Sequence, residues 1–197
     1  MRIFARTAFR RKTPLKAIGF LGSSGSGKTT LIESLIERFC RAGLRVAAIK
    51  HAHHGFDIDR PGKDSYRFRA AGAAQVLIGS GRRWALLSEE DVPDSASGDE
   101  LARQLARLGP CDLVLVEGYR GQAGLPFIEV RRSGTGTLHH TPPSGVATPT
   151  IDAGVIALAT DMKADGGPIQ SPVPVLDLND VDALARFIAI RLEVPWC

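Results

Sequence analysis

Residues 22–30, GSSGSGKTT, combine glycines, serines and threonines around a single lysine. Gly22, Gly27, Lys28 and Thr29 satisfy the pattern GxxxxGK(S/T) of a phosphate-binding loop. Glycines let the backbone curl until consecutive N–H groups point inward, and the positive end of the following helix attracts an anion. We expect Lys28 to reach the β- and γ-phosphates of a nucleotide and the Thr29 hydroxyl to ligate Mg²⁺, which prefers oxygen ligands. An apolar stretch precedes the loop and a helical pattern follows it, the context that separates this motif from a simple surface turn.

Three carboxylates are candidates for metal binding or catalysis beside that loop. Glu117 ends the apolar stretch LVLVE, where an acidic residue can hold Mg²⁺ through water or orient an attacking water. Asp57 and Asp59 follow a predicted strand within a long polar loop, and they are either part of the metal shell or simply solvated. Ligands of open α/β sheets lie at the carboxyl ends of strands, which favours a functional role. We therefore predict catalytic roles for Asp57 and Glu117, and a metal shell of Thr29, Asp59 and Glu117.

Strands and helices alternate along most of the chain. The patterns predict strands at 16–21, 45–49, 75–78, 84–87, 113–116, 126–130 and 155–159. Helices are expected at 29–42, 66–71, 99–108 and 180–192. Segment 113–116 is the most continuously apolar, as in a parallel sheet buried on both faces. The predicted class is α/β, a three-layer P-loop NTPase fold with a mostly parallel central sheet flanked by helices.

The 197 residues fit one domain, with room for a small subdomain. We expect a flexible basic leader over 1–15, a single nucleotide-binding domain over 16–197, and a flexible loop rich in glycine, threonine and proline near 133–150. Five arginines and lysines and no acid lie in residues 1–14, so the formal net charge of +4 belongs to the leader and not to the remainder. A nucleic-acid partner is therefore not expected, although the leader alone could bind one or act as an organellar targeting segment.

The apolar runs and the cysteines indicate the cellular compartment in which the protein works. No apolar run approaches the roughly 20 residues of a membrane-spanning helix, so no membrane partner is expected. The 3 cysteines are odd in number and widely spaced, which argues against a disulfide framework or a thiolate zinc site. These features favour a cytoplasmic protein.

Beyond the phosphate loop, the chain resembles the molybdopterin-guanine dinucleotide biosynthesis protein MobB family. The resemblance rests on IKHAHHGFDIDRPGKDSYRFRAAGA at 49–73 and DLVLVEGYR at 112–120, and it covers about residues 16–132. It implies a homodimeric GTP-binding protein of the P-loop GTPase class with weak hydrolysis. Such a protein assists the nucleotidyltransferase MobA in joining GMP to molybdopterin, so the implied ligands are GTP, Mg²⁺ and molybdopterin or its guanine dinucleotide.

The resemblance also assigns positions. The phosphate site comprises Gly22, Gly25, Gly27, Lys28, Thr29 and Thr30; the second motif comprises Lys50, His51, His53, Asp57, Asp59, Gly62, Lys63 and Asp64; the third comprises Glu117 and Gly118. Ser26, within the same loop, is counted with the cofactor-binding residues. On their own chemistry, Lys50, Lys63, Arg67 and Arg69 form a possible clamp for a phosphorylated ligand, or a solvated charged loop. We count Lys50, His51, His53 and Lys63 among the predicted cofactor-binding residues.

Base specificity rests on a weaker pattern. Many guanine readers carry Asn-Lys-x-Asp after a late strand, whereas residues 160–163 read TDMK. Asp161 is the candidate base-binding residue, and its alternative role is to cap the turn that follows. The expected preference for GTP over ATP therefore depends on the family resemblance.

Two other functions are open on the residues alone. His51, His53 and His54 suit nickel or zinc, as in a metallochaperone GTPase, although no cysteine lies nearby. A small-molecule P-loop kinase would use Arg67 and Arg69 to stabilise phosphate, although the late loop lacks the arginines of a kinase lid.

Overall fold

The structure is a computed structural model that describes residues 15–52, 56–88, 100–122, 124–133, 151–162, 169 and 171–195. The chain divides into two compact units, one formed by residues 1–51 and 101–197 and the other by residues 52–100. The first is called the nucleotide unit here and the second the hairpin unit, and each is described by itself. Within the described ranges, no helix is both long and apolar enough to cross a membrane.

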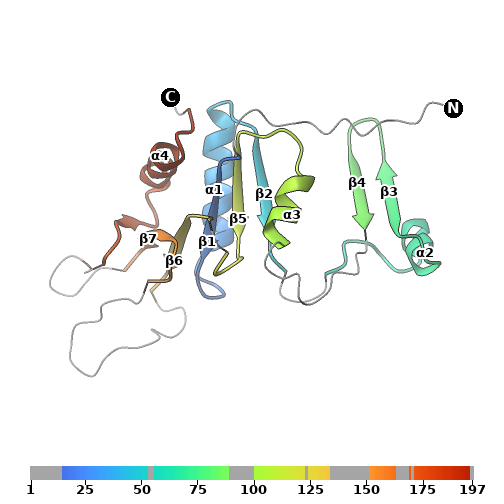
Figure 1. Cartoon of the computed structure of the whole chain (residues 1–197), viewed down its shortest axis with the longest axis horizontal. Coiled ribbons are helices and arrows are strands. Elements are labelled where there is room, and N and C mark those ends of the chain that lie inside the picture. Colours follow the sequence, from blue (N-terminus) through green and yellow to red (C-terminus); the bar gives the residue numbers. More distant parts are fainter. Residues whose placement is uncertain are drawn as a thin grey trace, which may run out of the picture. The chain divides into compact units, whose positions relative to one another are not determined.

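A six-stranded sheet forms the centre of the nucleotide unit (Figure 1). Its order is β2-β5-β1-β6-β7-β8, and every neighbouring pair is parallel. The strands are β1 (Ala17–Leu21), β2 (Val46–Lys50), β5 (Leu113–Glu117), β6 (Phe127–Arg131), β7 (Val155–Thr160) and β8 (Val175–Asp177). All six carboxyl ends therefore meet at one edge. The chain leaves β1 toward β2 on one side and leaves the neighbouring β5 toward β6 on the other, and such a reversal forms a ligand crevice in open α/β sheets.

Helices cover both faces of this sheet. Helix α1 (Lys28–Arg41) contacts α4 (Val181–Leu192), and the two contribute to one core with buried side chains of β1, β5, β6 and β7. Helix α3 (Glu100–Arg107) inserts Leu101 into the core on the other face, with Val114, Val116 and Phe127. The alternate residues of β1 and β5 thus enter different cores, as in a sheet buried on both sides.

Local sequence explains where α1 and α4 begin. Leu31, Leu35 and Phe39 recur every four residues and are buried, which gives α1 its apolar stripe. Helix α4 begins after Asp180, whose side chain accepts a hydrogen bond from the Ala183 N–H at 2.9 Å, an N-cap arrangement.

The hairpin unit contains α2 (Asp64–Ala70), β3 (Gln75–Gly79) and β4 (Trp84–Ser88). Strands β3 and β4 pair antiparallel in a sheet of their own, and α2 contacts β3. The register places Leu77 opposite Leu86 and Gly79 opposite Trp84, so Leu77, Leu86 and Trp84 share one face. Their exposed fractions are 66%, 48% and 71%.

The predicted fold class is confirmed, because a parallel central sheet lies between two layers of helices. Each expected strand and helix is present, with ends that differ by at most two residues. Two features were not predicted: the short β8, and the separation of β3 and β4 from the central sheet. The expected leader and the expected loop near 133–150 lie almost wholly outside the described residues.

Candidate functional site

The phosphate loop connects β1 to α1 at the carboxyl edge of the sheet. Gly22, Gly25 and Gly27 have φ values of 147°, 76° and 93°, a region that side-chain-bearing residues rarely adopt. A Cβ on Gly22 would lie 2.3 Å from the Val130 carbonyl oxygen, so the loop passes directly against β6. Ser26 is fully buried, and its hydroxyl has no hydrogen-bond partner among the described residues. The backbone thus has the curled form that the motif predicts.

Lys28 is turned back over this loop. Its Nζ donates to the Gly22 carbonyl oxygen at 3.0 Å and to the Ser23 carbonyl oxygen at 2.7 Å. The ammonium group therefore lies over the concave side of the loop, where a polyphosphate would sit. An ammonium held there supplies a compact positive charge for phosphate oxygens.

Thr29 and Glu117 meet although they are 88 residues apart in the chain. The Thr29 hydroxyl donates to Glu117 Oε2 at 3.0 Å. Two neighbouring ligands of an octahedral Mg²⁺, each about 2.0–2.1 Å from the metal, stand about 2.9 Å apart. The pair therefore fits the oxygen donors and spacing that Mg²⁺ requires, and Thr29 and Glu117 are the residues that would hold it. Bound Mg²⁺ would neutralise charge on the phosphates.

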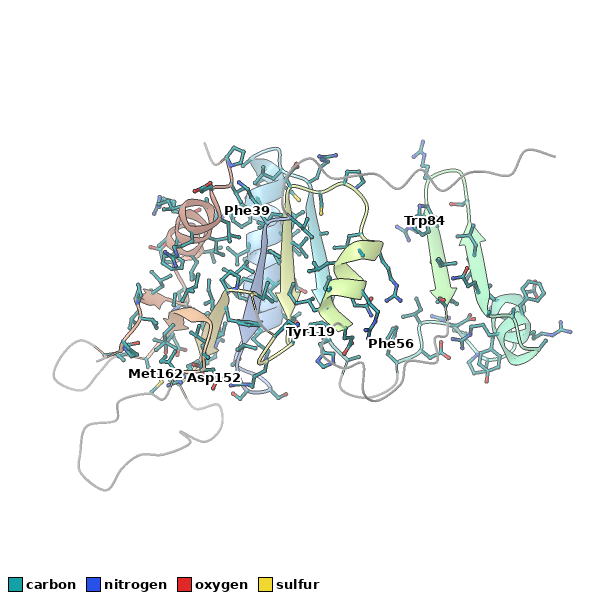
Figure 2. The ribbon with its side chains drawn as sticks, viewed as in Figure 1. Phe39, Phe56, Trp84, Tyr119, Asp152 and Met162 are labelled. Carbon is teal, nitrogen blue, oxygen red and sulfur yellow. The ribbon has the colours of Figure 1, made fainter. Side chains whose placement is uncertain are left out.

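The turn after β5 fixes the backbone of Glu117. The His51 N–H donates to the Glu117 carbonyl oxygen at 2.9 Å, and the His51 ring stacks on Tyr119 with centroids 4.4 Å apart. Gly118 has a φ of 95°, and a Cβ there would come within 2.8 Å of the His51 Cβ. Tyr119 itself has a φ of 59° and is buried, at the lower end of β5 in Figure 2. His51 therefore supports the turn that carries Glu117. The sequence did not indicate that Tyr119 packs against His51 in this turn.

Asp161 lies at the same edge, directly after β7. Its carboxylate accepts from the Ser133 N–H at 2.7 Å and from the Ser133 hydroxyl at 3.2 Å. Arg132, the first residue after β6, brings its Nε to 4.0 Å from the same carboxylate. The guanidinium also approaches within 3.2 Å of the Cβ position of Gly27. Arg132 is thus beside the phosphate loop, a placement that sequence reasoning missed because no motif marks it.

Asp57 and Asp59 belong to the hairpin unit and form an ion-paired cluster there with Arg69. Arg69 Nη2 lies 2.7 Å from Asp57 Oδ2, and Arg69 Nε lies 3.8 Å from Asp59 Oδ2. The Asp59 N–H donates to Asp57 Oδ1 at 2.8 Å, and the Ser65 hydroxyl donates to Asp59 Oδ1 at 2.8 Å. The hydrogen bond from the Asp59 backbone and that from Arg69 lower the pKa of Asp57.

The remaining predicted residues are divided between the units. Lys50 ends β2 in the nucleotide unit, directly opposite Glu117 in the register of β2 with β5. Lys63 precedes α2 in the hairpin unit and is exposed, and His53 lies outside the described residues. The structure therefore brings Lys28, Thr29, Glu117, Lys50, His51 and Asp161 to one edge, while catalytic Asp57 and metal-ligating Asp59 stay predictions. In the described part of the chain, no group of three or more histidine, cysteine or acidic side chains could hold a metal ion.

A parallel sheet with a glycine-rich loop after its central strand, a lysine over that loop and a Thr–Glu pair beside it defines a P-loop nucleotide-binding protein. The chain belongs to the family described as "Molybdopterin guanine dinucleotide synthesis protein B", whose model matches residues 17–161.

Similar proteins support this assignment over most of the chain. The chain is 41% identical to the molybdopterin-guanine dinucleotide biosynthesis adapter protein of Escherichia coli (strain K12), over 90% of this chain and 93% of the relative. It is 39% identical to the adapter protein of the same name from Haemophilus influenzae, over 94% of this chain and 93% of the relative. A crystal structure of molybdopterin-guanine biosynthesis protein B is 26% identical, with a TM-score of 0.62 over 90% of this chain and 99% of that one.

Proposed function

We propose that this chain is a GTP-binding adapter in molybdenum cofactor biosynthesis, which assists the attachment of GMP to molybdopterin. The observation that carries the proposal is the Thr29–Glu117 contact of 3.0 Å beside the phosphate loop, in a chain that belongs to this family. The adapter role comes from the names of the relatives, both of which match nearly their whole length. Mg²⁺ accompanies the nucleotide, held by Thr29 and Glu117, and any hydrolysis is slow.

The proposed partners are a MobA-type nucleotidyltransferase and molybdopterin or its guanine dinucleotide. An adapter acts by bringing a ligand and an enzyme together, so nucleotide binding and partner binding are separate properties of the chain. We place the protein in the cytoplasm, because the thiols of Cys40 and Cys111 are free, as suits a reducing compartment.

We also propose that the protein is a homodimer. In the hairpin unit, Leu77, Leu86 and Trp84 expose three large apolar side chains on one face of a two-stranded sheet. A two-stranded hairpin is only marginally stable by itself in water, so a second copy that covers this face would stabilise it.

Lys28→Ala tests the phosphate site. Lys28 is only partly buried and its contacts are two carbonyl oxygens of its own loop, so its loss should leave the protein folded. We expect binding of fluorescent GTP with Mg²⁺ to weaken about 100-fold or more, the effect of removing a charge-assisted contact to phosphate. Lys16→Ala is the matched control, since Lys16 donates to the Glu193 carbonyl oxygen away from the phosphate loop. Wild-type affinity in Lys28→Ala would show that this loop is not the nucleotide site.

Partner and base are tested together. A pull-down with purified MobA-type enzyme, combined with competition of labelled GTP by unlabelled GTP or ATP, measures both. We expect retention of the enzyme and displacement by GTP but not by ATP at equal concentration. Equal displacement by the two nucleotides would contradict the guanine preference, and no retention would contradict the adapter role.

A further inference from the structure

The turn that follows β5 has an unusual backbone for the residues it contains. Gly118 and Tyr119 have φ values of 95° and 59°, so two consecutive residues with positive φ come directly after Glu117. Glycine adopts such values freely, whereas a bulky residue such as tyrosine rarely does. Strain of this kind persists only where the surroundings hold it, and it gathers at functional sites. Neighbouring groups must therefore hold Tyr119 in this conformation.

His51 contacts three consecutive residues of this turn. Its ring stacks on the Tyr119 ring, with centroids 4.4 Å apart and an angle of 24° between the ring planes. Its N–H donates to the Glu117 carbonyl oxygen at 2.9 Å. Its Cβ fills the space that a side chain at position 118 would need, because a Cβ on Gly118 would lie 2.8 Å from it. A single residue after β2 thus fixes the path of the chain after β5.

The peptide between Glu117 and Gly118 is bonded on both sides. The Gly118 N–H donates to the Phe20 carbonyl oxygen of β1 at 3.1 Å, and the Glu117 carbonyl oxygen accepts from His51. A rotation of this peptide would disturb both hydrogen bonds, and it would move the Glu117 carboxylate from its place 3.0 Å from the Thr29 hydroxyl. Mg²⁺ demands near-ideal octahedral geometry, so a small displacement of one ligand weakens its binding.

Tyr119 lies on the other face of the sheet from Thr29. It is buried in the core that includes Val116, Leu125 and Leu101 of α3. Thr29 belongs to α1, whose apolar stripe enters the opposite core. Tyr119 is therefore not placed to contact a metal held by Thr29 and Glu117, and any influence on that metal passes through the backbone of the turn.

We propose that His51 and Tyr119 are positioning residues for the metal site, because their stack holds the turn after β5 with the Glu117 carboxylate directed at Thr29. The inference rests on the proposed binding of GTP with Mg²⁺ and adds two residues that act on the metal without touching it. The stack should contribute to the gain in GTP affinity that Mg²⁺ brings and not to the affinity for GTP alone, since Lys28 is held by carbonyl groups of its own loop.

The test measures the affinity of the full-length chain for fluorescent GTP twice, in EDTA and in saturating Mg²⁺. The ratio of the two dissociation constants is the gain due to the metal. Tyr119→Leu and His51→Leu each remove one ring and leave an apolar side chain. We expect the gain to fall about three- to tenfold in either variant, the usual range for an aromatic pair, while binding in EDTA stays within about twofold of wild type. Glu117→Gln removes the charge of the ligand itself and should lower the gain further.

Three further variants separate positioning from general packing. Tyr119→Phe keeps the ring and should keep the gain. Phe39→Leu removes a ring from the opposite core, near the other end of the sheet in Figure 2, so it should lower the melting temperature but keep the gain. The double variant Tyr119→Leu with His51→Leu should lose about as much as either single variant, because each change alone abolishes the same stack.

The possible results are distinguishable. If Tyr119→Leu and His51→Leu keep the wild-type gain, or if Phe39→Leu loses it equally, the stack does not position the ligand and the proposal is wrong. Losses that add in the double variant would also contradict it, because the two residues would then act separately. His51 is only half-buried, so His51→Leu preserves the test if thermal melts show that Tyr119→Leu is unfolded.

The wild type separates this inference from the proposed function. Wild-type binding of GTP with no gain from Mg²⁺, or a full gain in Glu117→Gln, would overturn the inference and leave nucleotide binding intact. Failure of the wild type to bind GTP in either condition would instead overturn the proposed GTP-binding function itself.

Discussion

Gly22 carries two separate constraints, one from its own backbone and one from its neighbour. Its φ of 147° is unfavourable for a residue with a side chain, and a Cβ would lie 2.3 Å from the Val130 carbonyl oxygen. The second constraint is the more severe, because the atom that would have to move belongs to the backbone of β6. The close approach of loop and strand thus ties the shape of the phosphate site to the central sheet.

Gly22→Ala is therefore expected to destabilise the protein as well as its nucleotide site. We expect the free energy of unfolding to fall by about 3 kcal/mol or more, from the strained φ and the clash together. Gly43→Ala is the matched control: Gly43 has a φ of 84° but nothing lies within 4 Å of its Cβ position, so only strain of about 1 kcal/mol is expected. Urea denaturation measures both, and equal losses would contradict the clash.

At the scale of elements, the cluster of Asp57, Asp59 and Arg69 ties an irregular loop to α2. Apolar and acidic residues alternate over 56–59. Phe56 and Ile58 are exposed, while the carboxylates of Asp57 and Asp59 lie against Arg69. Arg69 also lies over the Tyr66 ring, 5.7 Å from its centroid. The loop is thus held by charge and not by apolar burial, which makes its order depend on pH.

The pKa of the Asp57 carboxyl group is a direct measure of this pH dependence. Its pKa in the folded chain is below the ordinary value, so the ionised form stabilises the loop above that ordinary value and the contribution is lost as pH falls through the lowered pKa. A carboxyl ¹³C NMR titration should show the lowered pKa in wild type. Arg69→Gln should bring the pKa only part of the way back, because the hydrogen bond from the Asp59 N–H remains. Arg67→Gln, an exposed neighbour on α2, should leave it unchanged, and a full return in Arg69→Gln would contradict the backbone contribution.

The elements also show what the sequence could and could not predict. The phosphate loop and its lysine were predictable because their spacing lies within nine residues, and Glu117 because it ends an apolar strand. Strand β8 was missed because its three residues follow a stretch rich in proline and carry no alternation. Residues 75–79 and 84–88 were predicted as strands, but apolar content alone does not tell a hairpin from strands of the central sheet. Arg132 was missed because its place beside Gly27 depends on the packing of β6 against the loop after β1.

The two units differ in whether their large apolar side chains are buried or exposed. The nucleotide unit buries its large side chains in two cores, one on each face of its sheet. In the hairpin unit Val76 is buried, whereas Leu77, Leu86 and Trp84 on the opposite face are exposed (Figure 2 labels Trp84). An exposed apolar face of this kind is unfavourable in a monomer, because its side chains remain in contact with water and contribute no hydrophobic stabilisation on folding.

The exposed hairpin face gives the homodimer a test in solution. If a second copy covers this face, Leu77→Asn with Leu86→Asn removes two opposed apolar side chains from the interface and should shift the protein from dimer to monomer in sedimentation velocity at micromolar concentration. Both positions are exposed in a single chain, so the fold of each unit should survive the change. Ile190→Asn is the control, since Ile190 on α4 is 76% exposed and belongs to the other unit. A wild-type monomer, or a double variant that stays dimeric while Ile190→Asn dissociates, would show that the hairpin face is not the surface that joins two copies.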